Sequence, residues 1–309
     1  MYTLEEICLV NVATRIYNCF ELKKNVLHCE EKTKELRIRE GLQIPLALKD
    51  RIVALMKPIE LEVHNWMSDH DGILKTSGEE SFCEFHWNPD ATVDRIRTAD
   101  ALIGSQRLDN PTRFVLSCQY WHGRKIIPVY RKLDAETKEY FLERDFDGKD
   151  EHQSNVEKWI REQKGTKPNC NVFCRCRTFR WTDVSLHSRF LDCLPDFNRE
   201  YVLCTKFKET HKMHIGRFCL SRMSAQNREY MLAAFPLKVL SIYLFWPCQT
   251  FFMEAARKVW RDLSENEFLC LLHIMICQKI IALWTDFNYM KLLRQFWHES
   301  PDNLKQYTK

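Results

Sequence analysis

Glycine and proline are too scarce in this chain for a fold built on many tight turns. The 309 residues hold only 8 glycines and 10 prolines, while 45% of them are apolar and 12% aromatic. All-β folds spend glycine and proline on many turns. Disordered chains lack this apolar content. The composition therefore predicts an ordered chain made mainly of helices.

Apolar residues recur at helical spacing along most of the chain after residue 92. Helices are expected at 93–108, 124–133, 135–144, 156–163, 190–194, 199–208, 214–223, 225–235, 237–245, 251–263, 265–284 and 287–298. The segments that begin at Phe114 and Tyr201 are similar, which indicates a degenerate helix-pair repeat without a regular period. We predict an all-α fold, with an N-terminal three-helix segment followed by an irregular α-solenoid-like helical-repeat array.

Three parts are expected along the chain. Residues 1–57 would form the three-helix segment, residues 58–165 the first half of the array and residues 166–309 the second half. A polar linker is expected at 145–154. Glycine and proline interrupt the helical pattern between Lys164 and Cys170, which marks the boundary between the two halves.

A first short pattern, Thr3-Leu4-x-x-x-Cys8-x-x-x-Val12, lies at the start of the chain. Its last three residues are spaced four apart, so they share one face of a helix. Thr3 is a good N-cap, and Glu6 three residues later completes a capping box. The pattern therefore predicts a helix that starts at Leu4.

A second pattern, Ile44-Pro45-x-x-Leu48-x-x-x-Ile52, follows within the first 55 residues. Proline is tolerated in the first turn of a helix, where its missing N–H costs little. A short helix is expected here, with Leu48 and Ile52 on one face.

Together the two patterns resemble the two-part box by which substrate receptors of ubiquitin ligases dock on elongin C and a cullin. The resemblance covers residues 1–57 alone. It implies that Leu4, Cys8 and Val12 enter a hydrophobic pocket of elongin C. It also implies that the second set contacts the cullin: Ile44, Pro45, Leu48 and Ile52.

The form of the second pattern resembles the von Hippel-Lindau-type box, which implies cullin-2 rather than cullin-5. The SOCS-type box of cullin-5 receptors has an additional proline where Gln43 stands, and a tyrosine where Arg51 stands. The N-terminal position of the box is similar to that in ZYG-11-like receptors. The chain would be a non-catalytic subunit with elongin B, elongin C, a cullin and an unknown protein substrate as its partners.

The alternative interpretation is a helical-repeat scaffold for protein interactions, unrelated to ubiquitin. Its N-terminal helices would then merely cap the solenoid. The exposure of Leu4 and Cys8 distinguishes the receptor from the scaffold, because a docking helix leaves these side chains accessible and a cap buries them.

Enzyme motifs are absent from the sequence, and no cofactor is expected. There is no glycine-rich phosphate loop, nucleophile elbow or zinc-protease pattern. One cysteine cluster resembles a set of metal ligands: Cys170, Cys174 and Cys176, which Cys204, His211 and His214 could complete. Its spacing fits no common zinc finger, so no metal is predicted. An enzyme with a cysteine nucleophile or this zinc site remains a third alternative.

Composition also indicates the cellular compartment and the classes of partner that are expected for the chain. Its 14 cysteines, with no signal peptide, indicate reduced thiols in the cytoplasm or nucleus and not a secreted protein. The net charge of +4 is interspersed, so no nucleic-acid partner is expected. Charged and polar residues interrupt the apolar stretches 231–253 and 268–284, so no membrane partner is expected either.

Two sets of residues are expected in the core. The first is the cysteines at apolar helical positions, Cys118, Cys219, Cys270 and Cys277. The second is the aromatic residues of the last quarter: Trp246, Phe251, Phe252, Trp260, Trp284, Phe296 and Trp297. Any of these that lay exposed in a groove would anchor a partner.

Overall fold

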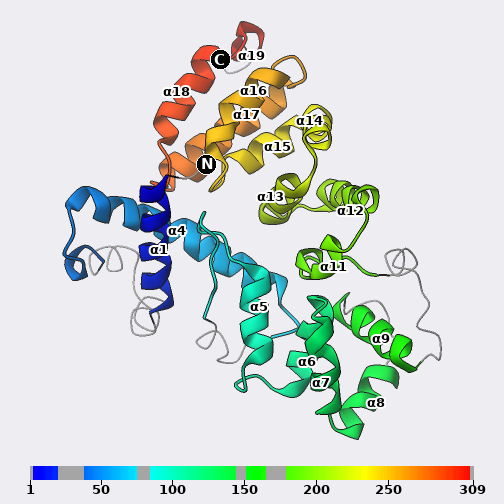
Figure 1. Cartoon of the computed structure of the whole chain (residues 1–309). Coiled ribbons are helices and arrows are strands. Elements are labelled where there is room, and N and C mark those ends of the chain that lie inside the picture. The colour runs from blue at the N-terminus through cyan, green and yellow to red at the C-terminus, as the bar shows by residue number, and fades with distance from the viewer. Residues whose placement is uncertain (1–2, 20–37, 75–83, 144–150, 165–178, 307–309) are drawn as a thin grey trace. The chain divides into compact units, whose positions relative to one another are not determined.

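The computed structural model describes residues 3–19, 38–74, 84–143, 151–164 and 179–306 (Figure 1). These residues form helices and connecting segments, and no strand occurs among them apart from two isolated bridges. The prediction of an all-α helical-repeat fold is confirmed.

The chain groups into two compact units. Unit 1 contains residues 1–62, 89–92 and 203–309, and unit 2 contains residues 63–88 and 93–202. Helices α4 (Leu46–Asp69) and α12 (Asp196–Glu209) contribute residues to both units. This grouping differs from the predicted parts, since α4 continues past residue 57. The predicted boundary at residue 165 lies outside the described residues.

Unit 2 is built around helix α6. Its helices are α5 (Arg95–Gly104), α6 (Asn110–Gln119), α7 (Gly123–Arg131), α8 (Ala135–Glu143), α9 (Glu151–Lys164), the short η2 (Ser185–His187) and α11 (Arg189–Asp192). Helix α6 packs against α5, α7 and α9. Phe114 of α6 contacts Phe141 and Trp159, with ring centroids 5.6 Å apart in each case. This apolar cluster joins α6, α8 and α9.

Helix α9 begins five residues before the predicted range 156–163, inside the expected polar linker. Its first turns make specific polar contacts. The His152 carbonyl accepts a hydrogen bond from Gln119, and the amide of buried Asn155 donates to Gln119 Oε1 and to the Arg180 carbonyl. Distant partners thus stabilise helix in a sequence whose local composition indicated a linker.

Unit 1 is built around helix α15 (Pro236–Tyr243). Its other helices are α1 (Leu4–Asn18), the first part of α4, α13 (Met213–Arg222), α14 (Ala225–Ala234), η3 (Gln249–Phe251), α16 (Phe252–Val259), α17 (Glu265–His273), η4 (Ile274–Ile281), α18 (Tyr289–Glu299) and α19 (Asp302–Gln306). Helix α15 packs against α13, α14, α16 and α17. A Cβ atom at Gly216 would lie 2.7 Å from Ile242 Cδ1, so glycine permits the close approach of α13 and α15.

The predicted helix 265–284 changes type in its middle. Helix α17 passes into η4, which is a π-helix. Such wide turns are rare and place side chains differently from an α-helix. Within η4, Lys279 is fully buried, and its Nζ atom lies 3.7 Å from the ring centroid of Phe245 and 3.9 Å from that of Trp284.

The core predictions for cysteines and aromatic residues hold only in part. Cys118 and Cys219 are buried, but Cys270 and Cys277 are exposed. Helix α17 buries the face of Phe268, Leu271 and Leu272, which excludes Cys270. Among the aromatic residues, Phe252 and Phe296 are buried, whereas Phe251 and Trp297 are exposed.

The helices were also searched for candidate membrane spans. Within the described part of the chain, none combines the length and the apolar character that crossing a membrane requires. The apolar stretches 231–253 and 268–284 are each divided among several helices.

Candidate functional site

Helix α1 starts at Leu4, as its capping box predicts. The Thr3 backbone N–H donates to Glu6 Oε2 over 2.7 Å, and the Glu6 N–H donates to Thr3 Oγ1 over 3.2 Å. The hydrogen bond from the Thr3 backbone lowers the pKa of the Glu6 carboxyl. The first turn, which carries Leu4, is thus fixed by local contacts.

The two faces of α1 differ sharply. Leu9, Val10 and Ala13 are buried and hold the helix against the protein. On the other face, Leu4 is 78% exposed and Val12 is 38% exposed. Cys8 between them is an exposed free thiol. The three residues that the first pattern selects therefore lie on the outward face of α1.

An ion pair joins the start of α1 to α4. Arg51 donates to a carboxylate oxygen of Glu5, and both side chains are largely exposed. Exposed pairs of this kind contribute only about 0–1 kcal/mol, so the buried face carries most of the attachment. Arg51, where a SOCS-type box would have tyrosine, has a role within the chain.

The second pattern is only partly accessible. Pro45 is exposed, and Ile44 and Leu48 are half-buried. Ile52 is 0% exposed, so it packs inside unit 1 and has no surface to offer a cullin. Leu46, which the pattern does not include, is 63% exposed beside Pro45.

Pro45 caps the helix instead of lying in its first turn. Its carbonyl accepts hydrogen bonds from the N–H groups of Leu48 and Lys49, over 3.0 and 3.1 Å. The helix is also long, not short, since α4 has 24 residues and contains Pro58. The buried apolar side chains on both sides of Pro58 outweigh its missing hydrogen bond.

Helix α4 is attached to the C-terminal helices of the same unit. Lys57 Nζ donates to the carbonyls of Ala282 and Leu283, over 3.0 and 3.2 Å, just beyond η4. Glu62 forms an ion pair with Arg217 of α13, and Glu62 is buried. Helix α4 is therefore held against the helices of residues 203–309.

The cysteine cluster at residues 170–176 lies outside the described residues. Of its possible completing ligands, Cys204 is half-buried, His211 is exposed and His214 is buried. Among the described residues, no group of three or more His, Cys, Asp or Glu side chains could hold a metal ion. Burial raises the pKa of the Cys248 thiol to about 11, so this thiol is protonated at neutral pH.

Three comparisons of this chain with known proteins found no match. No protein-family model matches it, and neither a curated protein nor a solved structure is detectably similar to it. The hypothesis that α1 is a docking helix therefore depends on the two patterns between residues 3 and 52 and on the exposure of their side chains.

Proposed function

We propose that this protein is the substrate-recognition subunit of a ubiquitin ligase that contains elongins B and C and a cullin. Leu4, Cys8 and Val12 would insert into elongin C. Ile44, Pro45 and Leu48 would face the cullin, with cullin-2 favoured over cullin-5. Ile52 would act through the packing of α4, because it is buried.

One observation carries the proposal: the outward face of α1 keeps apolar side chains in water. Leu4 is among the most exposed large apolar residues described, although the neighbouring Leu9 and Val10 are buried. Leaving a leucine exposed forgoes about 1.5–3 kcal/mol of burial energy, which binding to a partner would recover. Leu4, Cys8 and Val12, which the box resemblance selects, are all exposed.

In this role the protein makes and breaks no covalent bonds. It would hold a substrate close to a ubiquitin-charged enzyme and so raise the effective concentration of the substrate's lysines. A docking helix paired with α4 suits this task, since the contacts of Lys57 and Glu62 in turn hold α4 against the C-terminal helices. The described cysteines are free thiols, which accords with the cytoplasm or nucleus as the place of action.

Co-expression with elongins B and C, followed by size-exclusion chromatography, tests the proposal. We expect a stoichiometric complex to elute, and added cullin-2 to join it in preference to cullin-5. Elution of the folded chain alone would refute the docking assignment.

The second candidate function is a helical-repeat scaffold whose N-terminal helices cap the array. The hydrogen bonds from Lys57 of α4 to the carbonyls just after η4 favour this function. Through them an N-terminal helix satisfies carbonyl groups at the end of a helix of the array. A cap predicts no elongin complex, so the same chromatography separates the two functions.

A further inference from the structure

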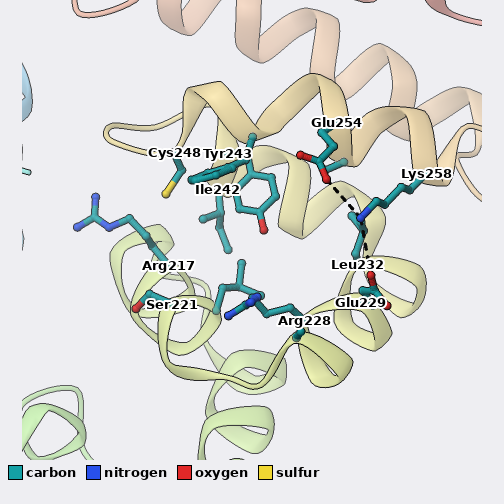
Figure 2. A pocket seen from close by; sticks show the side chains of 14 residues that line it. Arg217, Ser221, Arg228, Glu229, Leu232, Ile242, Tyr243, Cys248, Glu254 and Lys258 are labelled. Carbon is teal, nitrogen blue, oxygen red and sulfur yellow. Dashed lines mark ion pairs between the residues drawn. The ribbon is translucent and has the colours of Figure 1, made fainter. Parts of the chain in front are cut away.

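Helices α13, α14, α15 and α16 enclose a cavity in unit 1 (Figure 2). Its volume is about 540 Å³, within the range of about 300–1,000 Å³ that is usual for ligand sites. Apolar side chains, including Leu232 and Ile242, line part of the wall. Phe251 also lines it and is 54% exposed, so this aromatic side chain can meet an incoming ligand.

Arg228 and Tyr243 supply hydrogen-bond donors to the cavity. Figure 2 shows the Arg228 guanidinium and the Tyr243 hydroxyl directed into it from α14 and α15. Arg228 Nη1 donates to the Met223 carbonyl over 2.8 Å, which holds the side chain in place. Burial raises the pKa of the Tyr243 hydroxyl, so it stays protonated and able to donate.

The other cations at the cavity are already paired. Lys258 lies 3.4 Å from Glu254 and 3.7 Å from Glu229, and both glutamates are largely exposed (Figure 2). Arg217 is paired with Glu62. Within the described part of the chain, no carboxylate forms an ion pair with Arg228. Arg228 is therefore the cation that remains available to a ligand.

We propose that this cavity binds a short segment of a substrate protein that carries a carboxylate side chain beside an apolar side chain. The carboxylate would accept hydrogen bonds from Arg228 and Tyr243, in the strong geometry of a charged pair. The apolar side chain would pack on Phe251 and Leu232. This inference depends on the proposed function, because it names what the receptor recognises.

A peptide fits this cavity better than a lipid-like acid does. Five charged side chains line the wall: Arg217, Arg228, Glu229, Glu254 and Lys258. An alkyl chain laid against them would remove them from water without replacing their hydrogen bonds. A peptide backbone brings amide groups that can make those bonds.

Fluorescence polarisation with labelled octapeptide pools tests the inference on the full chain without elongins. The pools share a fixed central pair, Leu-Glu, Leu-Gln or Leu-Lys, between mixed flanking residues. We expect the Leu-Glu pool to bind at least about tenfold more tightly than the others. Arg228→Gln should abolish this preference, and Arg294→Gln, at an exposed arginine of α18, should leave it intact.

Two further variants guard against misfolding of the Arg228 variant. Tyr243→Phe keeps the packing and should weaken the Leu-Glu pool alone. Phe251→Ala should weaken every pool that binds. Equal binding of the three pools, no binding of any pool, or a preference that survives Arg228→Gln would each overturn the inference. Because elongins are absent, failure here leaves the elongin complex as a separate result.

Discussion

Apolar side chains are usually buried and charged side chains usually exposed. The outward face of α1 and the buried charges of unit 1 depart from this arrangement in opposite ways. Leu4 and Cys8 are apolar or weakly polar and lie in water, whereas Glu62 and Lys279 are charged and lie inside. The buried groups have partners within the chain, namely Arg217 for Glu62 and aromatic rings for Lys279. The apolar side chains on the outward face of α1 are exposed instead, so their partner is expected to be another protein.

The comparison teaches that the two regions should respond differently to mutation. Changing a buried charge should cost folding stability, because its partner is left unsatisfied inside the protein. Changing the outward face of α1 should cost binding and leave stability nearly unchanged.

The largest effect is expected at Glu62. Glu62→Ala leaves the Arg217 guanidinium mostly buried without its carboxylate, which should lower the free energy of unfolding by about 3–5 kcal/mol. Urea denaturation followed by circular dichroism measures this. The double variant Glu62→Leu with Arg217→Met should recover most of the loss. A cost below about 1 kcal/mol for the single change would mean that the pair is well hydrated.

The outward face of α1 provides the next effect. Leu4→Ala together with Cys8→Phe should weaken elongin C binding by about a hundredfold or more, since both residues would leave or block its pocket. The melting temperature should hardly change, because both side chains are exposed. Leu283→Ala, at another highly exposed leucine, serves as the matched control. Unchanged affinity in the double variant would remove the basis of the docking assignment.

Lys279 should make stability depend on pH. Burial lowers the pKa of its ammonium to about 8, from 10.5. Between these values the folded chain releases a proton that the unfolded chain keeps, so stability should rise with pH. The rise should be about 2 kcal/mol, because contacts with the aromatic rings partly offset the cost of burial.

Lys279→Met should abolish that rise, whereas Lys291→Met, at an exposed lysine of α18, should keep it. Urea denaturation at a series of pH values between about 7.5 and 10.5 measures the free energy of unfolding of both variants. Asp286 and Tyr289 face the same ammonium, and burial raises the pKa of each. A rise that persists in Lys279→Met would assign it to other groups.

The smallest effect is expected from the cap of α1. Thr3→Ala removes the hydroxyl that accepts from the Glu6 N–H and donates to Glu6 Oε2, which should cost about 1 kcal/mol of helix stability. Elongin affinity should fall by about fivefold, because fraying displaces Leu4. Ser264→Ala removes the equivalent hydroxyl from the capping box of α17 and should leave the affinity unchanged. The same loss of affinity in both variants would show a general effect of stability.

Local signals made the beginning of α1 predictable from the sequence. Thr3 and Glu6 are three residues apart and satisfy each other, so no distant contact is needed. Most helices of the array were also predicted to within a few residues by their apolar spacing. The length of α4 was not, because Pro58 reads as a helix breaker until the buried residues around it are known.

The sites inside unit 1 could not be predicted because distant segments assemble them. Glu62 and Arg217 are 155 residues apart, and no local pattern links them. Lys279 interrupts an apolar stretch, and its burial depends on Phe245 and on a π-helical turn that the sequence does not signal. The cavity likewise draws Arg228 and Tyr243 from different helices.

Thiol labelling of Cys8 tests most directly the proposal that α1 docks on elongin C. A maleimide is added to the chain with and without elongins B and C, and mass spectrometry measures modification of each cysteine. We predict that elongins reduce the labelling rate of Cys8 by more than about tenfold, because an interface excludes the reagent. The exposed Cys193, Cys270 and Cys277 should keep their rates as internal controls. Equal labelling of Cys8 in the presence and absence of elongins would contradict the account.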